Sequence, residues 1–237
     1  LRAAGYETLL IGLQHEGDEK KRGEMAFDVD TGRIYGEDSD IADLSGNVIP
    51  VAMRELAKRA DSEQPFLARI GLQDCHTHYQ DSDATFNFSY YTDKACAKDT
   101  VQPLPFLKDT PLMRSDLARY AGCIKTMDEQ LGKLFDMLES SGLAENTFVV
   151  FTTDHGMPFP RAKGTLYDSG TQCACIMRWP KGFAGGRAID ALTGHIDLLP
   201  TIVDAAGAEM PEGVEGQSLL PLLQEREGFE RDCIFLE

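Results

Sequence analysis

The sequence is poor in positive charge and has no long hydrophobic run. Lys and Arg total 23 against 39 Asp and Glu, so the formal net charge is −16. Because like charges repel, this balance argues against nucleic acid or an anionic membrane surface as a partner. No stretch reaches the roughly 20 consecutive apolar residues that cross a bilayer. We therefore expect no membrane span, and an anionic substrate would need a local positive site.

None of the six cysteines belongs to a C-x-x-C pair, so the sequence does not favour a structural zinc site. Cys173 and Cys175 alternate with Ala174 in "QCACIMRW", and a strand would turn both toward one face. This pattern predicts two small, buried free thiols. The number and spacing of the cysteines fit a reduced or an oxidised compartment.

The chain also lacks internal repeats, low-complexity linkers and a Met at position 1. It opens with "LRAAGYETLLIG", which reads as the end of a helix running into a strand and not as a signal peptide. We therefore expect a piece of a longer protein. A length of 237 residues with 42% hydrophobic residues allows a substantial core, and one domain over 1–237 is the simplest organisation.

Apolar runs and helical periodicities alternate along the sequence. The patterns predict strands at 6–12, 65–72, 147–153, 171–179 and 231–237, and helices at 46–60, 112–142 and 195–207. Strands that alternate with helices are typical of the α/β class. We expect a mostly parallel sheet sandwiched between helices.

Four of the five histidines come directly after three predicted strands. His15 follows the first, His76 and His78 follow the second, and His155 follows the third. Ligands of open α/β sheets bind beyond the carboxyl ends of the strands, so these residues are expected at one edge of the sheet. His78 is equally well explained as a solvated loop residue. His195 precedes a predicted helix and is left out of the site.

The segment "FTTDHGMPFPRAKGTLYDSG" (151–170) concentrates ionisable side chains in one turn. Asp154 and His155 can face one ion only if the turn is tight, and a carboxylate with an imidazole is a common half-shell for a divalent cation. An Asx-type turn explains the same pair without a metal. Lys163 follows in a proline-stiffened loop that can hold an ammonium over a bound anion. Arg161 has the same potential, or is a solvated loop cation.

Several blocks of the sequence resemble the sulfatase family of the alkaline phosphatase superfamily. They are "LRAAGYETLLIGLQHEG", "PFLARIGLQDCH", "YAGCIKTMDEQLGKLFDML", "VVFTTDHG", "KGTLYDSG", "IMRWP" and "HIDLLPTIVDAAG", and they occur in the family's order over the whole chain. The run "DHGMPFPRAKGTLYD" is most similar to the N-sulfoglucosamine sulfohydrolase (heparan N-sulfatase) branch. The resemblance implies an alkaline phosphatase-like α/β fold.

The resemblance also implies roles for individual residues. Asp154 and His155 match ligands of a Ca²⁺ ion, with Mg²⁺ as the alternative, and Lys163 matches the cation that holds the sulfate. His76 matches a histidine that contacts a sulfate oxygen or the leaving group, and His15 matches the histidine of a "K-x-H" pair beside the nucleophile. The nucleophile of the family is a formylglycine made from Cys or Ser in a "C/S-x-P-x-R" motif.

The sequence departs from this pattern in two places. Leu13 stands where the family has the lysine of "K-x-H", so a compensating cation or a weakened site is expected. The chain contains no "C/S-x-P-x-R" motif, which we expect before residue 1, together with a strand near the middle of the sheet. A C-terminal subdomain is expected after residue 237. The chain would then be a partial catalytic domain that is inactive alone and has unpaired sheet edges.

We therefore predict a sulfatase that hydrolyses sulfate esters or sulfamates, with a sulfated saccharide as the substrate class and no nucleic-acid or membrane partner. Two alternatives stay open: a phosphate or phosphonate monoester hydrolase of the same superfamily, and a non-catalytic homologue that binds sulfated glycan. The resemblance implies export to the periplasm, the extracellular space or a lysosome. The oligomeric state is not predicted.

Overall fold

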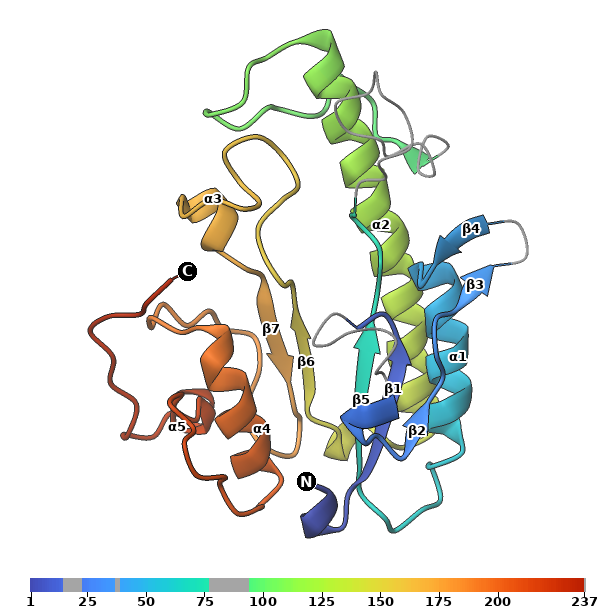
Figure 1. The fold of residues 1–237 in the computed structure, drawn as a ribbon, viewed down its shortest axis with the longest axis vertical. Helices are drawn as coiled ribbons and strands as arrows, with labels where there is room; N and C mark the ends of the chain where they lie inside the picture. The colour runs from blue at the N-terminus through green and yellow to red at the C-terminus, as the bar shows by residue number, and fades with distance from the viewer. Residues whose placement is uncertain (15–22, 37–38, 77–93, 237) are drawn as a thin grey trace.

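The computed structural model describes residues 1–14, 23–36, 39–76 and 94–236. The strands are β1 (Glu7–Gly12), β2 (Val29–Asp30), β3 (Tyr35–Gly36), β4 (Ser39–Ala42), β5 (Phe66–Gly71), β6 (Val149–Thr152) and β7 (Cys175–Arg178). The α-helices are α1 (Ser45–Ala57), α2 (Pro111–Ser140), α3 (Asp168–Thr171), α4 (Leu198–Ala205) and α5 (Leu220–Leu223). Short 3-10 helices include η1 (Arg2–Ala4), η4 (Ala144–Asn146) and η5 (His195–Asp197). The predicted α/β class is confirmed (Figure 1).

The first sheet has the order β2-β1-β5, and both of its strand pairs are parallel. The central strand β1 is apolar without alternation, as expected for a strand that is covered on both faces. Its residues Leu9, Leu10 and Ile11 are each 0% exposed. This sheet therefore holds the most deeply buried strand of the described chain.

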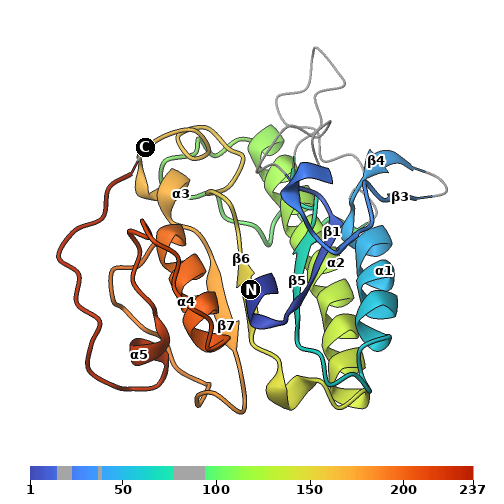
Figure 2. The same ribbon diagram turned by 60° about the horizontal axis from the view of Figure 1, so that its bottom comes forward.

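Helices α1 and α2 pack together against one face of this sheet (Figure 2). Ile49 and Leu56 of α1 meet Leu134 and Leu138 of α2 in one hydrophobic cluster with the apolar side chains of β5. Helix α2 begins where the Thr110 side chain accepts a hydrogen bond from the backbone N–H of Met113. These helices confirm the two amphipathic segments predicted at 46–60 and 112–142.

The second sheet pairs β6 with β7 in antiparallel register, with Val150 opposite Met177. Helices α4 and α5 lie on the side of this sheet away from α1 and α2 (Figure 2). A hydrophobic cluster on that side of the sheet contains Leu219, Leu220 and Leu223, packed with aromatic residues that include Phe148 and Trp179. In the described structure, β5 pairs only with β1 and β6 only with β7.

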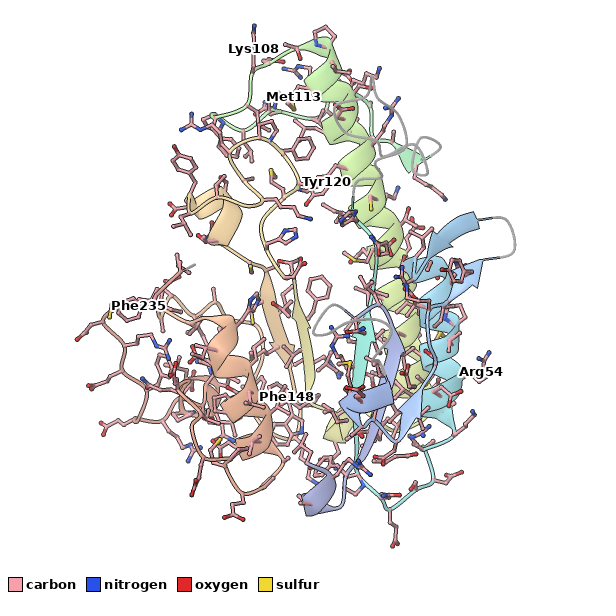
Figure 3. The ribbon with its side chains drawn as sticks, viewed as in Figure 1. Arg54, Lys108, Met113, Tyr120, Phe148 and Phe235 are labelled. Carbon is pink, nitrogen blue, oxygen red and sulfur yellow. The ribbon has the colours of Figure 1, made fainter. Side chains whose placement is uncertain are left out.

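Two sequence-based expectations are corrected by the structure. No strand forms over 231–236, because this segment has no neighbouring strand to pair with. Phe235 is 92% exposed and lies at the periphery of the molecule (Figure 3). Cys175 is exposed instead of buried, since β7 has only β6 as a neighbour. The short strands β2, β3 and β4 were not predicted. Within the described residues, no helix combines the length and apolarity of a membrane span.

Candidate active site

The loop between β6 and α3 is closed on itself by backbone contacts. The N–H of Gly156 donates to the carbonyl of Gly170 over 2.8 Å. A Cβ atom on Gly156 would lie 1.8 Å from the carbonyl oxygen of Ser169, so only glycine allows this approach. The residues that follow β6 are therefore held against the start of α3.

Lys163 returns to the beginning of this loop. Its backbone N–H donates to the carbonyl of Met157 over 3.1 Å, and the preceding Ala162 is 0% exposed. The side chain of Lys163 is exposed. The backbone thus brings Lys163 next to a residue only two positions beyond His155. Arg161 differs, because its guanidinium lies 4.9 Å from the ring centroid of Tyr167 and is engaged in a cation–π contact.

Asp154 and His155 place two electron-pair donors side by side. The Nδ1 of His155 lies 2.8 Å from the carbonyl oxygen of Gly156, which can only accept, so Nδ1 carries a proton. In the neutral ring Nε2 then presents a lone pair, 3.3 Å from Oδ2 of Asp154. Two such atoms repel unless a proton or a cation lies between them. The donor set and its tautomer therefore fit half of a cation site.

This pair also makes a local turn contact, because Oδ1 of Asp154 accepts a hydrogen bond from the N–H of His155 over 3.0 Å. The carboxylate remains 81% exposed. Among the residues that the structure describes, no group of three or more His, Cys, Asp and Glu side chains is arranged to hold a metal ion. The two side chains alone are far from the six to eight ligands that Ca²⁺ prefers.

His76 lies in a turn that follows β5, where its N–H donates to the carbonyl of Gln73 over 3.1 Å. Asp74, two residues earlier, accepts hydrogen bonds from the N–H and the hydroxyl of Ser45, the latter over 2.8 Å. Asp74 therefore holds the N-terminus of α1 and fixes the turn that carries His76. His15 and His78 fall outside the described residues.

One hydrophobic cluster supports both loops. Cys75, the neighbour of His76, and Met157 and Phe159, which follow His155, pack against the same part of α2. The ring of Phe159 meets that of Tyr120 edge-on, with 5.4 Å between the centroids. The two loops therefore pack against the same part of α2. A site that both loops share would need this arrangement.

A cation that the sequence analysis did not identify lies beside Leu13. Arg69 of β5 is half-buried, and its Nη1 donates to the carbonyl of Leu13 over 2.7 Å. Because Leu13 follows β1 directly, the guanidinium of Arg69 lies at the carboxyl edge of the sheet. The signal in the sequence was a single charged residue inside the apolar run "PFLARIGL".

His195 also lies closer to the site than expected, with Nε2 3.1 Å from the hydroxyl of Thr152 at the end of β6.

A separate hollow of about 550 Å³ is lined by Gly182, Phe183 and residues of the segment after α5. Its Arg187 is paired with Glu225 and with backbone carbonyls. The hollow contains none of the predicted site residues.

Comparisons with known proteins agree on one family. An ulvan-active sulfatase of Formosa agariphila is 28% identical over 72% of this chain and 33% of its own length. The human N-sulphoglucosamine sulphohydrolase is 27% identical over 94% of this chain and 48% of its own length. The chain thus spans one third to one half of these relatives.

The solved structure of a 2-O GAG sulfatase superposes with a TM-score of 0.66 over 95% of this chain and 55% of its own, at 19% identity. This likeness confirms the alkaline phosphatase-like α/β fold. A family model for sulfatases matches residues 1–208. The chain therefore belongs to the sulfatase family.

Proposed function

We propose that this chain supplies the cation-binding and sulfate-binding part of a hydrolase that acts on sulfate esters or sulfamates of a sulfated saccharide. The proposal is supported by the closed loop after β6, in which Asp154 and His155 are paired donors and the backbone N–H of Lys163 bonds to the carbonyl of Met157. Both curated relatives are sulfatases, and one is named for a sulfated amino sugar. Their names support the substrate class.

The residues of this chain would divide the work as follows. Asp154 and the Nε2 of His155 would hold a Ca²⁺ ion, with Mg²⁺ as the alternative, and the cation would neutralise charge on the sulfate. Lys163 would bind a sulfate oxygen through its ammonium group. His76 would contact a sulfate oxygen or the leaving-group oxygen, and His15 would lie beside the nucleophile.

Arg69 lies beside position 13, where Leu13 replaces the lysine of the family pattern. Its guanidinium is bound to the carbonyl of Leu13 and carries a permanent charge. We propose that Arg69 provides the positive charge that Leu13 cannot.

The nucleophile that we propose is a formylglycine in the segment before residue 1. The 237-residue chain alone should then release no sulfate. It should also bind Ca²⁺ only weakly, because two protein ligands leave most of the coordination sphere to water. Calorimetric titration of CaCl₂ into this chain and into the full-length protein would measure the difference.

The decisive experiment compares Lys163→Met with Arg161→Met in the full-length protein. The two cations belong to one loop, but Arg161 is committed to Tyr167. We expect Lys163→Met to lower kcat for sulfate release from glucosamine N-sulfate or 6-O-sulfate by about 10²- to 10³-fold. Arg161→Met should stay within about threefold, because it loses one surface contact.

Equal losses in the two variants would contradict the role of Lys163. Faster release of phosphate from a phosphate monoester would replace the proposal by the sister reaction of the superfamily. Binding of a sulfated saccharide without any release of sulfate would show a non-catalytic homologue instead.

A further inference from the structure

Two cysteines from distant parts of the sequence face each other beneath the turn that carries His76. Cys75 lies in that turn and Cys123 lies on α2, and their Sγ atoms are 3.4 Å apart. The backbone N–H of Cys75 also points at Sγ of Cys123, at 2.8 Å. All six cysteines are free thiols in the structure. The roles proposed above for the site residues do not involve these two cysteines.

We propose that Cys75 and Cys123 form a disulfide-forming site that fastens the His76 turn to α2. A disulfide has an S–S length of about 2.0 Å, so the two sulfur atoms need to approach by roughly 1.4 Å. A movement of this size is within the reach of side-chain rotation and a small shift of the turn. The inference depends on this geometry alone and not on the proposed function.

Cys75 and Cys123 differ in how tightly the surrounding structure holds them. Cys123 is 0% exposed and belongs to the interior of a 30-residue helix. The adjacent Gly122 is pressed against the chain, because a Cβ there would lie 2.5 Å from the carbonyl oxygen of Lys94. Cys75 is half-buried and has a φ of 70°, which residues other than glycine rarely adopt. Because Cys123 is fully buried within a long helix, we expect the turn that carries Cys75 to make the approach.

The reaction needs a disulfide as the oxidant, for which oxidised glutathione serves. The thiolate of Cys75 attacks one glutathione sulfur, which forms a mixed disulfide and releases one glutathione thiolate. The thiolate of Cys123 then attacks the Cys75 sulfur and releases the second glutathione. Two electrons pass to glutathione, and the two thiol protons go to solvent. Cys75 reacts first because it is the more exposed of the two.

The environment of the pair sets the conditions of the test. The hydrogen bond with Cys123, burial and the nearby charges of Cys123 and Asp74 all raise the pKa of the Cys75 thiol above its ordinary value. Little thiolate is therefore present at neutral pH and the exchange is slow, so oxidation should be carried out at a pH of about 8.5 over hours.

The experiment is peptide mapping of the 237-residue chain. The protein is kept reduced or incubated with oxidised glutathione, alkylated with iodoacetamide under denaturing conditions and digested with trypsin without reduction. Cleavage after Arg69, Lys94, Arg119 and Lys125 gives peptides 70–94 and 120–125, each with a single cysteine. We expect mass spectrometry of the oxidised sample to find these two peptides joined, with four of the six cysteines alkylated.

The bond should also raise the melting temperature by about 5–10 °C, because it closes a loop of roughly 50 residues in the unfolded chain. Cys75→Ser should abolish the joined peptide and the thermal shift. The matched control Cys96→Ser, at a half-buried thiol outside the pair, should retain both.

Peptide 70–94 recovered with glutathione or with carbamidomethyl on Cys75, and never joined to 120–125, would overturn the proposal. A link from Cys75 to any other cysteine would do the same. Mapping of the unmodified chain decides the question even if Cys75→Ser fails to fold.

Discussion

The two sheets of this molecule differ in how completely their strands are covered. In the parallel sheet, Leu9 at the centre of β1 is 0% exposed, and α1 and α2 seal one face. In the antiparallel sheet, Ile176 of β7 is 63% exposed, although α4 and α5 cover the other face. The first region buries its apolar surface within the chain. The second leaves part of it open, so it contributes less to the stability of the chain.

The largest expected difference between the regions comes from truncating one aliphatic side chain in each. Leu9→Ala leaves a cavity in a closely packed core and should lower the free energy of unfolding by about 3–5 kcal/mol. Ile176→Ala removes a side chain that is already in water and should change it by about 0.5 kcal/mol or less. Urea unfolding of the 237-residue chain measures both values. Similar losses would mean that β7 is as well supported as β1.

A smaller difference is expected between two ion pairs. Arg59 binds Glu7 through two parallel hydrogen bonds of 2.7 Å, and its side chain is 9% exposed. Arg178 binds Glu139 through one contact of 2.6 Å, with side chains that are 36% and 59% exposed. Glu7→Gln should therefore cost about 1.5–3 kcal/mol, because it weakens a bidentate pair and leaves a shielded charge.

Glu139→Gln is the matched change in the pair that ties β7 to α2, and it should cost less than about 1 kcal/mol, since solvent screens that pair. Urea midpoints at low and at moderate ionic strength would compare the two variants. Glu139→Gln should lose its effect as salt is added, whereas Glu7→Gln should keep most of it. The reverse order would show that the exposed pair is the stronger anchor.

The sequence predicted the fold best where the pattern was local. The apolar run of β1 and the spacing of apolar residues in α2 gave the element type and approximate bounds of both. The failures involve neighbours in space. The segment 231–236 has the composition of a strand, but it has no strand to pair with. The alternation around Cys175 predicted a buried residue, but one side of its strand is open to solvent. A sequence window contains no information about whether a partner strand exists.

The candidate site divides in the same way. Asp154, His155 and Lys163 are close in sequence, and the structure closes their loop as the turn residues suggested. Arg69 and the pairing of Cys75 with Cys123 depend on contacts across 48 or more positions, which single-sequence patterns do not encode. The role of His15 stays a prediction.

The smallest expected effect concerns the part of α2 that packs against the site loops. Asp116 is 2% exposed, and burial raises the pKa of its carboxyl above the ordinary value of 3.8, although the charges of Arg119 and Lys98 act in the opposite direction. A raised pKa in the folded state means that the charged carboxylate opposes folding. This cost is fully present above the folded pKa and disappears as the pH falls below the ordinary value.

Asp116→Asn should therefore raise the urea midpoint at pH 7, and the gain should shrink as the pH is lowered toward about 4. Asp128→Asn, an exposed change on the same helix, is the control and should have an effect within about 0.5 kcal/mol at either pH. A loss of stability for Asp116→Asn at pH 7 would show that the contact with Arg119, at 3.8 Å, outweighs burial. The N-terminal part of α2 would then resemble the parallel-sheet region, where the shielded charge of Arg59 is paired with Glu7.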